Sequence, residues 1–439
     1  MKILMVSNTY TPIVGGVERS IQSFTREYQR LGHDVLILTL EYDGAPCDEK
    51  GVVRIPALRR FNGSDFSVRL PIPVNLSGSL DEFKPDIIHS HHPIILGDTA
   101  LRIANKYKAP IVFTHHTKYE DYTHYVPLDS PELKKFVIEL TTGYANLVDC
   151  VIAPSQSIKQ MLLERGVKKP IEMIPTGVDC ERFRHGDGLN FRNEYKINSN
   201  DFLVGHVGRL AVEKNLIFLV KSVITFLKYH SHARFLLVGS GPSLAQVKDI
   251  FKKEKLEDRL VLTGALEGQE LIDAYHAMDV FAFSSKTETQ GIVLLEALAA
   301  GDPVVALDAT GVRDFIKDRL TGRIVFRENT EDFCEALDWV FGQDKHLEKE
   351  LKNNARQTAA SFSLDRMASQ FIDLYKSLLK KRFVSFDIEN SPWVSALGRI
   401  KVERDLISNY AEAVGAVIKD KIKEKRFSKS TNNIKEGRV

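Results

Sequence analysis

Two glutamates with seven residues between them could form part of a ligand site. Glu288 and Glu296 flank a short polar stretch and an apolar run. A buried strand is predicted over 279–283 and a helix over 292–300, so Glu288 follows the strand and Glu296 lies on the helix. The unpaired N–H groups of a helix start favour an anion such as a diphosphate, and carboxylates can accept hydrogen bonds from sugar hydroxyls. Taken alone, the pair would favour ordinary surface acids on a buried βαβ unit.

Two basic residues, Arg209 and Lys214, follow a strand predicted over 202–207 and precede a helix that begins at Leu216. A guanidinium group binds a phosphate as a fork and an ammonium group binds it as a point charge, so both could neutralise a diphosphate. Surface arginines and lysines are common, but a strand-to-helix turn is where open α/β sheets bind ligands. Their position therefore favours the ligand role.

Two histidine clusters, 89–92 and 114–117, each come directly after a predicted buried strand. Metal binding is the weaker interpretation, because adjacent side chains on an extended segment point apart and no cysteine or carboxylate shows ligand spacing. A single histidine that stabilises a phosphate–sugar group or polarises a hydroxyl fits better. His115 and His116 are both candidates, and we favour His116 because it directly precedes Thr117.

Two loops in the first part of the chain could approach a ligand. Gly16 ends the loop after a strand predicted over 2–6, where glycine would let the backbone come close to a phosphate or sugar, or would simply allow a tight turn. The stretch 117–127 has no regular period and is rich in aromatic and charged residues, which indicates a functional loop. Its aromatic candidates for ligand binding are Tyr119, Tyr122 and Tyr125.

Strands and helices alternate through both halves of the chain, which predicts parallel sheets covered by helices. Residues 175–199 lack a strong period and contain several Gly, Asp and Asn residues, so the connection between two α/β domains is placed there. A long amphipathic helix is predicted over 362–379. In both halves the polar candidates collect at the carboxyl ends of strands, which form the ligand-binding edge of such sheets.

The composition of the 439 residues is that of a soluble globular protein, with 43% hydrophobic and 27% charged residues. A net charge of +2 is too small to indicate a nucleic-acid binder. The four cysteines have no CxxC spacing, which fits reduced thiols in the cytoplasm. No apolar run approaches the roughly 20 residues that span a bilayer, so any membrane contact is expected to be peripheral.

Two basic segments could contact an anionic membrane surface. In the first, Arg59, Arg60 and Arg69 are interleaved with aromatic and apolar residues. In the second, beyond residue 380, the chain holds 13 Lys and Arg against 8 Asp and Glu, with a helical spacing of apolar residues. Each has a plain alternative: a solvated loop with anchoring aromatics, and a packing helix with a frayed basic end.

Four motifs together resemble one enzyme family. They are Gly15-Gly16 with Glu18, GRLAVEKN at 208–215, LVGSGP at 237–242 and E-TQGIVLL-E at 288–296. Over about residues 1–380 the chain resembles the retaining glycosyltransferases of family 4, which have the GT-B fold. The resemblance implies two Rossmann-like domains with parallel sheets that face each other across a cleft, here followed by a helical basic tail. We expect 1–180 to form the acceptor domain, 181–362 the nucleotide-sugar domain, and 363–382 a closing helix that crosses back to the first domain. The tail, 383–439, lies outside the resemblance.

The resemblance also assigns roles to the candidate residues. Glu288 and His116 would be the catalytic residues, with Glu288 on the transferred sugar. Arg209 and Lys214 would bind the donor diphosphate and Glu296 the ribose, while the leaving phosphate oxygen takes the acceptor proton on the same face. No Asp-x-Asp metal motif is present, so charge handling falls to the two cations and the helix end, and neither a metal nor another cofactor is expected. Further diphosphate contacts are implied for Gly16, Gln290, Gly291 and Ile292.

The segments 91–97, 113–127 and 311–316 are similar to the diacylglycerol glucosyltransferase branch of this family. They imply transfer of a hexose, glucose from UDP-glucose, to diacylglycerol, by an enzyme that is peripheral on the cytoplasmic face of the cell membrane. Two alternatives stay open. The same chemistry could serve phosphatidylinositol, a polysaccharide or a soluble sugar, or the chain could be a non-catalytic membrane-surface protein, against which the four intact charged side chains of the donor site argue.

Overall fold

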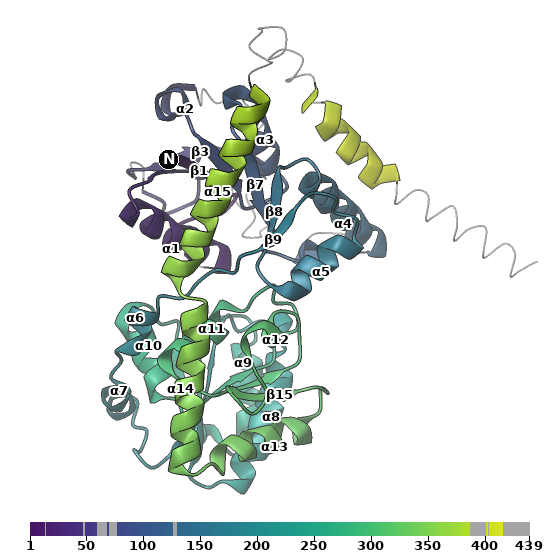
Figure 1. Cartoon of the computed structure of the whole chain (residues 1–439). Helices are drawn as coiled ribbons and strands as arrows, with labels where there is room; N and C mark the ends of the chain where they lie inside the picture. Colours follow the sequence, from purple (N-terminus) through teal and green to yellow (C-terminus); the bar gives the residue numbers. More distant parts are fainter. Residues whose placement is uncertain are drawn as a thin grey trace, which may run out of the picture. The chain divides into compact units, whose positions relative to one another are not determined.

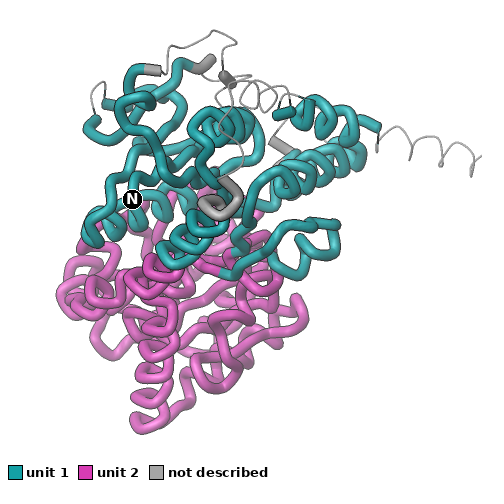
Figure 2. The backbone as a smooth tube through the Cα atoms, turned by 45° about the horizontal axis from the view of Figure 1, so that its top comes forward, with its two compact units in different colours: residues 1–153, 158–173, 371–439 teal, residues 154–157, 174–370 magenta. Residues whose placement is uncertain are grey.

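The computed structural model (Figure 1) describes residues 1–13, 15–46, 49–58, 68–69, 77–125, 130–386, 401–402 and 404–415. The chain forms two compact units, which are coloured separately in Figure 2. Unit 1 comprises Met1–Ala153, Ile158–Met173 and Phe371–Val439, and unit 2 comprises Pro154–Ser157 and Ile174–Gln370. The long segment of unit 2 begins at residue 174, whereas the sequence predicts that the second domain begins at 181.

Unit 1 is built on a seven-stranded parallel sheet in the order β3-β2-β1-β6-β7-β8-β9 (Figure 1). Strands β6, β7 and β8 are buried along their whole length, as expected for parallel strands that are covered on both faces. The chain order reverses between β1 and β6, so a switch point lies at their carboxyl ends. The strands are β1 Lys2–Val6, β2 Asp34–Leu40, β3 Val52–Ile55, β6 Ile87–Ser90, β7 Ile111–Thr114, β8 Cys150–Ala153 and β9 Ile171–Met173, with a separate antiparallel pair formed by β4 Ala57–Leu58 and β5 Val68–Arg69.

Helices connect these strands and bury one apolar face each. In α1 the buried residues include Phe24 and Tyr28, one helical turn apart. The helix α4 begins at a serine cap, because Ser130 accepts a hydrogen bond from the N–H of Leu133. The helices are α1 Gly16–Arg30, α2 Ser77–Phe83, α3 Leu96–Tyr107, the 3-10 helix η2 Tyr119–Tyr125, α4 Pro131–Ala145 and α5 Gln156–Glu164.

Unit 2 is built on a six-stranded parallel sheet in the order β12-β11-β10-β13-β14-β15. Successive strand residues face two different cores: Leu203 and Phe281 belong to one hydrophobic cluster, and their neighbours Val204 and Ala282 belong to another. The switch point of this sheet lies between β10 and β13. The strands are β10 Phe202–Val207, β11 Ala233–Val238, β12 Leu260–Gly264, β13 Val280–Phe283, β14 Val304–Leu307 and β15 Gly322–Val325.

The stretch 175–199, which lacks a strong period, forms two short helices. Each helix is too short to show a hydrophobic period. The sequence marks each of them only by the aspartate that caps its first turn. The side chain of Asp179 accepts from the N–H of Arg182, and that of Asp187 accepts from the N–H of Asn190. The helices of unit 2 are α6 Cys180–Arg184, α7 Gly188–Glu194, η3 Val212–Lys214, α8 Leu216–Tyr229, α9 Leu244–Lys253, η4 Glu257–Arg259, α10 Gly268–Ala277, α11 Ile292–Ala300, α12 Val312–Phe315, α13 Thr330–Phe341 and α14 Lys345–Ser361.

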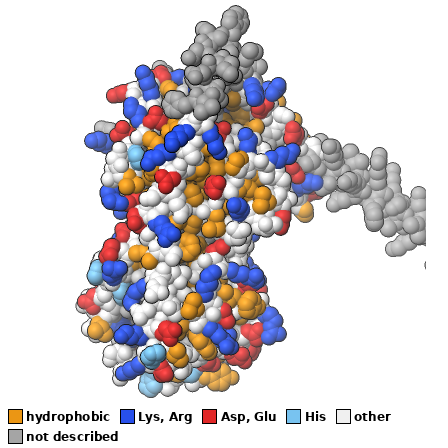
Figure 3. Space-filling model, in the orientation of Figure 1, with side chains coloured by type: hydrophobic (Ala, Val, Ile, Leu, Met, Phe, Trp, Pro, Cys, Tyr) orange, Lys and Arg blue, Asp and Glu red, His pale blue; other side chains and the backbone are white. Residues whose placement is uncertain are grey.

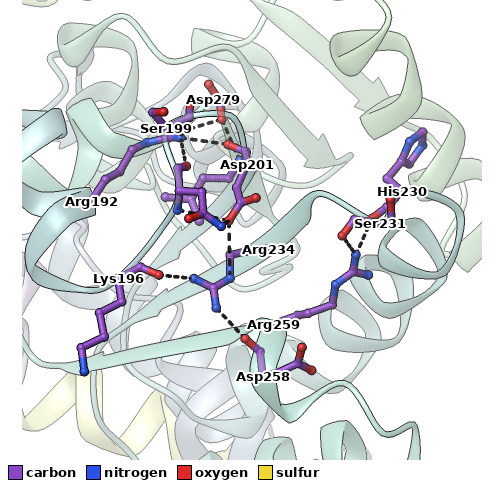
Figure 4. Close-up of polar contacts among 12 residues, drawn as sticks. Arg192, Lys196, Ser199, Asp201, His230, Ser231, Arg234, Asp258, Arg259 and Asp279 are labelled. Carbon is purple, nitrogen blue, oxygen red and sulfur yellow. Dashed lines mark hydrogen bonds and ion pairs between the residues drawn. The ribbon is translucent and has the colours of Figure 1, made fainter.

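A buried arginine fastens the amino ends of two central strands of unit 2 (Figure 4). Arg192 on α7 donates to the carbonyl of Asp201 and to Asp279 Oδ2, both at 2.8 Å. Asp279 Oδ2 also accepts from the N–H of Leu203, the second residue of β10, at 2.7 Å. These groups lie at the strand starts, so the network stabilises the sheet at the edge opposite the one where parallel strands bind ligands.

The helix α15 spans Leu364–Phe386 (Figure 1), so its first residues belong to unit 2 and those from Phe371 onward belong to unit 1. Within unit 1, Phe371 packs edge-on against Phe24, with ring centroids 4.9 Å apart. Tyr375 is fully buried and its ring lies edge-on to that of Tyr28. This part of α15 therefore completes the packing of unit 1 against α1.

Residues 404–415 form a helix, the longest described part of the tail. Leu406 joins the hydrophobic core of unit 1, and Asn409 Nδ2 donates to the carbonyl of Leu140 at 3.2 Å. One face of this helix is thus a packing face. The other tail residues, apart from 383–386 and 401–402, lie outside the described residues, and so do Arg59, Arg60 and the side chain of Arg69.

On the face drawn in Figure 3, Lys and Arg side chains are interspersed with Asp and Glu side chains. This mixture is in keeping with the small net charge of +2. Among the helices that the structure describes, none combines the length and the apolar character that crossing a bilayer requires.

Candidate active site

Two oppositely charged candidates meet at the carboxyl edge of the unit 2 sheet. Lys214 ends the short helix η3 after β10, and Glu288 lies in the loop between β13 and α11. Lys214 Nζ is paired with Glu288 Oε1, and both side chains are 20% exposed. Ser284 Oγ donates to the Lys214 carbonyl at 3.0 Å, which ties the two loops together. The pair therefore lies at the switch point of the sheet, where open α/β sheets bind ligands.

The helix α11 presents backbone amides at the same edge. Its cap is Gly291, whose φ of +77° is strained for any residue with a side chain. No side-chain hydrogen bond from the described residues caps this helix start. The amides of Gly291 and Ile292, together with the positive end of the helix, can therefore bind an anion.

The second glutamate is held by a tyrosine that sequence reasoning missed. Glu296 is 6% exposed, and its Oε2 accepts a hydrogen bond from Tyr275 OH at 2.9 Å. Tyr275 is fully buried on α10. The sequence signal for Tyr275 is the apolar period of residues 268–277, which indicates a core residue rather than a site residue. A carboxylate oriented in this way can accept hydrogen bonds from neighbouring hydroxyls of a sugar.

The side chain of Gln290 fixes the loop that leads into α11. Its amide is buried: Oε1 accepts from the N–H of Thr176 at 2.7 Å, and Nε2 donates to the carbonyl of Thr176 at 2.6 Å. A second tether comes from Ser155, whose Oγ donates to the carbonyl of Thr289 at 2.7 Å. Ser155 belongs to the short segment 154–157 of unit 2, and Thr176 lies near the start of its long segment 174–370. Only the backbone amide of Gln290 was predicted to act here, and both partners were missed because these contacts join loops far apart in the sequence.

Arg209 is exposed directly after β10, on a turn that glycines hold in place. A Cβ atom on Gly239 would lie 1.9 Å from the carbonyl oxygen of Gly208. A Cβ atom on Gly241 would lie 2.4 Å from the carbonyl oxygen of Leu210. The two glycines of the LVGSGP motif are therefore required for close backbone packing, which supports the turn that presents Arg209.

A neutral histidine lies near the Lys214–Glu288 pair, at the carboxyl edge of the unit 2 sheet, which we call the donor edge. His206, near the end of β10, is buried, and its Nδ1 donates to the carbonyl of Ala282 at 2.9 Å. Burial is the main cause that lowers the pKa of His206 to about 4. The hydrogen bond to Ala282 and the charge of Glu288 oppose this shift, and the charge of Lys214 adds to it. His206 therefore adds no charge to the site at physiological pH.

In unit 1, the glycine turn before α1 leaves room for a buried carboxyl group. A Cβ atom on Gly15 would lie 2.5 Å from Glu18 Oε2. Burial raises the pKa of Glu18, and a hydrogen bond with Thr9 opposes that shift. Gly16 opens α1 and is exposed at the carboxyl end of β1. The first glycine thus leaves room for the Glu18 carboxyl group, while the second stays available to a ligand.

The two histidine clusters of unit 1 are in direct contact, and His91 Nδ1 and His116 Nε2 lie at hydrogen-bond distance, 2.9 Å apart. His115 is 1% exposed, and neither of its ring nitrogens has a hydrogen-bond partner in the described part of the chain. His116 is half-buried. Burial lowers the pKa of His115 to about 3 and holds the pKa of His116 well below its ordinary value. His116 is therefore the more accessible of the two neutral candidates.

The predicted acceptor loop forms the 3-10 helix η2. The ring of Tyr119 lies edge-on to that of His115, with centroids 6.1 Å apart, and Glu120 is paired with Arg165. The side chains of Tyr122 and Tyr125 lie outside the described residues. Within the ranges that the structure describes, no group of three or more His, Cys, Asp and Glu side chains is arranged to hold a metal ion.

Two family models match the chain one after the other. The model described as Glycosyltransferase Family 4 matches residues 14–182. The model described as Glycosyl transferases group 1 matches residues 188–358. The second match contains all the charged candidates of the donor edge, and the first contains both histidine clusters.

Several curated proteins are similar to the chain. It is 30% identical over 345 residues to an alpha-monoglucosyldiacylglycerol synthase of Streptococcus pneumoniae, covering 75% of this chain and 76% of that protein. It is 26% identical over 397 residues to the protein of the same name from Acholeplasma laidlawii, covering 87% of this chain and 98% of that protein. It is 32% identical over 341 residues to the sulfoquinovosyl transferase SQD2 of Arabidopsis thaliana, covering 74% of this chain and 62% of that protein.

Solved structures share the architecture. Anabaena Alr3699/HepE in complex with UDP aligns with a TM-score of 0.68 at 19% identity, covering 86% of this chain and 100% of that chain. Sucrose-phosphate synthase from Thermosynechococcus elongatus aligns with a TM-score of 0.70 at 18% identity, covering 87% and 99%. These likenesses confirm the predicted GT-B fold of two Rossmann-like parts with parallel sheets. Because the family models match in sequence and a relative is 30% identical over most of its length, the chain belongs to glycosyltransferase family 4 and is a glycosyltransferase.

Proposed function

We propose that this enzyme transfers a hexose, glucose from UDP-glucose, to diacylglycerol with retention of configuration, and so makes a membrane glycolipid. The observation that carries the donor half of the proposal is the Lys214–Glu288 pair at the switch point of the unit 2 sheet. The acceptor half is supported by the two similar proteins named alpha-monoglucosyldiacylglycerol synthase. The aromatic loop 117–127 is the proposed acceptor segment, with Tyr119, Tyr122 and Tyr125 against the lipid.

In the proposed complex the donor diphosphate lies at the start of α11. Arg209 and Lys214 meet its charge, so Lys214 exchanges Glu288 for a phosphate oxygen, and Glu288 becomes available to the sugar hydroxyls. Glu296, oriented by Tyr275, binds the ribose. Two cations and a helix end compensate the diphosphate charge, and we propose that the reaction needs no metal. The further proposed diphosphate contacts are Gly16, Gln290, Gly291 and Ile292.

Glu288 and His116 are the proposed catalytic residues. The bond from the anomeric carbon to the diphosphate oxygen breaks, and a bond to the acceptor oxygen forms on the same face of the sugar. The leaving phosphate oxygen takes the proton of the acceptor hydroxyl. Lys214 and the start of α11 stabilise the charge that develops on that oxygen. His116, which is neutral because burial lowers its pKa, supplies a hydrogen bond to the sugar rather than a charge.

A lipid acceptor implies work at a membrane surface. We propose that the enzyme acts peripherally on the inner face of the cell membrane, drawn there by Arg59, Arg60, Arg69 and the basic tail. Each basic residue near an anionic surface contributes roughly 1 kcal/mol. Sedimentation with vesicles tests this directly, because binding should require anionic lipid and weaken at high salt. Equal binding to neutral vesicles would contradict it.

An assay of UDP release tests the whole proposal. The full chain is incubated with UDP-glucose and vesicles with or without diacylglycerol, and the lipid extract is analysed. Glycolipid should form only when both are present, and Glu288→Gln should lower turnover about 100-fold or more. The matched control is Glu254→Gln, which removes an exposed ion pair with Lys228 and should leave turnover unchanged. Glucose transfer to phosphatidylinositol, a polysaccharide or a soluble sugar in place of diacylglycerol would overturn the acceptor assignment.

A further inference from the structure

Three histidine rings of unit 1 are in contact: His89 and His91 form a stack, and His116 lies edge to edge with His91. The rings of His89 and His91 have centroids 4.2 Å apart at an interplanar angle of 26°, and those of His91 and His116 are 5.1 Å apart at 22°. They meet because β6 and β7 are neighbours in the sheet, with His89 paired in register to Val112. His91 follows the end of β6, and His116 follows the end of β7 by two residues. Two clusters that are separate in the sequence thus become one group of contacting rings.

The first ring of the stack is fastened at both nitrogens. His89 Nε2 lies 2.6 Å from Thr114 Oγ1, and His89 Nδ1 lies 2.7 Å from Tyr375 OH. Phe371 covers the same ring, with centroids 5.3 Å apart. The ring of His89 cannot rotate without breaking two buried hydrogen bonds, so it offers His91 a fixed face to stack on.

His91 connects this fixed face to His116. Its side chain is 1% exposed, and its backbone N–H donates to the carbonyl of Val6 at 2.8 Å. Its Nδ1 bonds His116 Nε2 at 2.9 Å, while its Nε2 is buried with no hydrogen-bond partner in the described part of the chain. Burial holds the pKa values of both rings well below their ordinary value, so both rings are neutral. A neutral imidazole carries one proton, so in this bond one ring donates and the other accepts. The bond therefore orients the His116 ring and couples its tautomer to that of His91.

We propose that His91 is a positioning residue for His116 in the transfer reaction. The inference rests on the proposed role of His116 as a catalytic residue. His91 acts through the ring of His116 and not on the sugar itself. His89, held by Thr114 and Tyr375, supports His91 from behind, so the α15 helix also contributes to the placement of His116.

Two substitutions separate the hydrogen bond from the packing of the ring. His91→Phe keeps an aromatic ring in the stack and removes the nitrogen that bonds His116. It should lower kcat about 10- to 100-fold through misplacement of His116, while KM for UDP-glucose stays within about twofold. His91→Asn places an amide nitrogen near the position of Nδ1 and should restore most of kcat. The matched control is His346→Phe, which changes an exposed histidine on α14 and should alter neither parameter.

A double-mutant cycle and a spectroscopic readout complete the test. In a His116→Ala background, His91→Phe should cause no further loss of kcat, because its effect passes through His116. Imidazole nitrogen NMR should show His116 as a single tautomer in the natural chain and as a mixture in His91→Phe. A folded His91→Phe enzyme with unchanged kcat, an equal further loss in the His116→Ala background, or unchanged nitrogen signals would each overturn the proposal.

Failure of the proposed function is distinguishable from failure of this inference. If the natural chain makes no glycolipid from UDP-glucose and diacylglycerol, the function fails, while the nitrogen signals of His116 still test the bond from His91. If thermal melting shows that His91→Phe does not fold, His91→Gln replaces it. The longer side chain of glutamine carries its amide at the level of Nε2, so it should fail to bond His116 and should lose kcat in the same way.

Discussion

Gln290→Leu is the substitution that should damage the donor edge without removing a charged group. Leucine fills a similar volume but lacks the amide that bonds the N–H and the carbonyl of Thr176 at 2.7 and 2.6 Å. Thr176 is 6% exposed, so each of its two backbone groups would lose a buried hydrogen bond. Each lost buried hydrogen bond costs about 1–3 kcal/mol, so unit 2 should lose about 2–6 kcal/mol of unfolding free energy. The loop that leads into α11 should also lose its fixed position.

Urea unfolding and calorimetric titration with UDP measure the two consequences. The affinity for UDP should fall about tenfold or more, because the amides that receive the diphosphate no longer have a fixed geometry. The control is Gln269→Leu, which removes an exposed amide that bonds the His185 carbonyl and should change stability by less than about 0.5 kcal/mol. Unchanged unfolding free energy and unchanged UDP affinity in Gln290→Leu would refute the reasoning.

Three further outcomes follow from the packing and the charges. Gly143→Ala should release the helix 404–415, because a Cβ atom there would lie 1.6 Å from Asn409 Oδ1, and amide hydrogen exchange of that helix should become faster. Tyr275→Phe should weaken UDP binding about fivefold, since the loss of about 1 kcal/mol from one hydrogen bond frees the carboxylate of Glu296. The free energy of unfolding should fall as the pH drops from 6.5 towards 4, by up to about 1.4 kcal/mol per pH unit for each histidine that is neutral in the folded chain and protonated in the unfolded one. The histidines concerned are His89, His92, His115 and His206, whose pKa values burial lowers from 6.5 to about 3 or 4. Their contribution to the free energy of unfolding is therefore fully present above pH 6.5 and is lost at acidic pH.

Each of these outcomes has a control. Gly78→Ala introduces the same methyl group on α2, where no atom lies within 4 Å, and should leave the exchange of 404–415 unchanged. Unaltered exchange in Gly143→Ala would show that the contact with Asn409 is not maintained in solution. Equal UDP affinity in Tyr275→Phe would mean that Glu296 needs no partner. For the pH prediction, His206→Asn should reduce the slope of the unfolding free energy against pH below 6.5 by the equivalent of about one proton. An unchanged slope would contradict the conclusion that His206 is neutral in the folded chain.

The strand and helix that carry Glu288 and Glu296 could be predicted because their sequence signals are local. The strand β13 is a short apolar run, and α11 begins after Gly291 and ends at Gly301, so the structure confirms both elements within a residue. Hydrophobic periodicity and the positions of glycines depend only on residues close in the sequence. They place Glu288 in the loop before the helix and Glu296 within the helix. The pairing of Lys214 with Glu288 follows once both loops are assigned to adjacent strands.

The tethers of the site could not be predicted in the same way. Gln290 and Thr176 are 114 residues apart, and both lie in segments without a period. Tyr275 has the spacing of an ordinary core residue, although its hydroxyl orients Glu296. The contact of His91 with His116 depends on the order of β6 and β7 in the sheet, which no local pattern specifies. In each case the missing information is the three-dimensional neighbour rather than the identity of the residue.

The membership of α15 in both units has a consequence for recombining this enzyme with its relatives. Unit 2 is nearly continuous in sequence, so a chimera can receive it as a single insert that covers 174–370. Unit 1 is not continuous, because Phe371 and Tyr375 pack on α1 and on the strand that contains His89. A graft of unit 1 must therefore move 1–173 and the part of α15 from Phe371 onward together. Exchange of the first segment alone would join a foreign α1 to a helix whose aromatic residues were selected for a different surface.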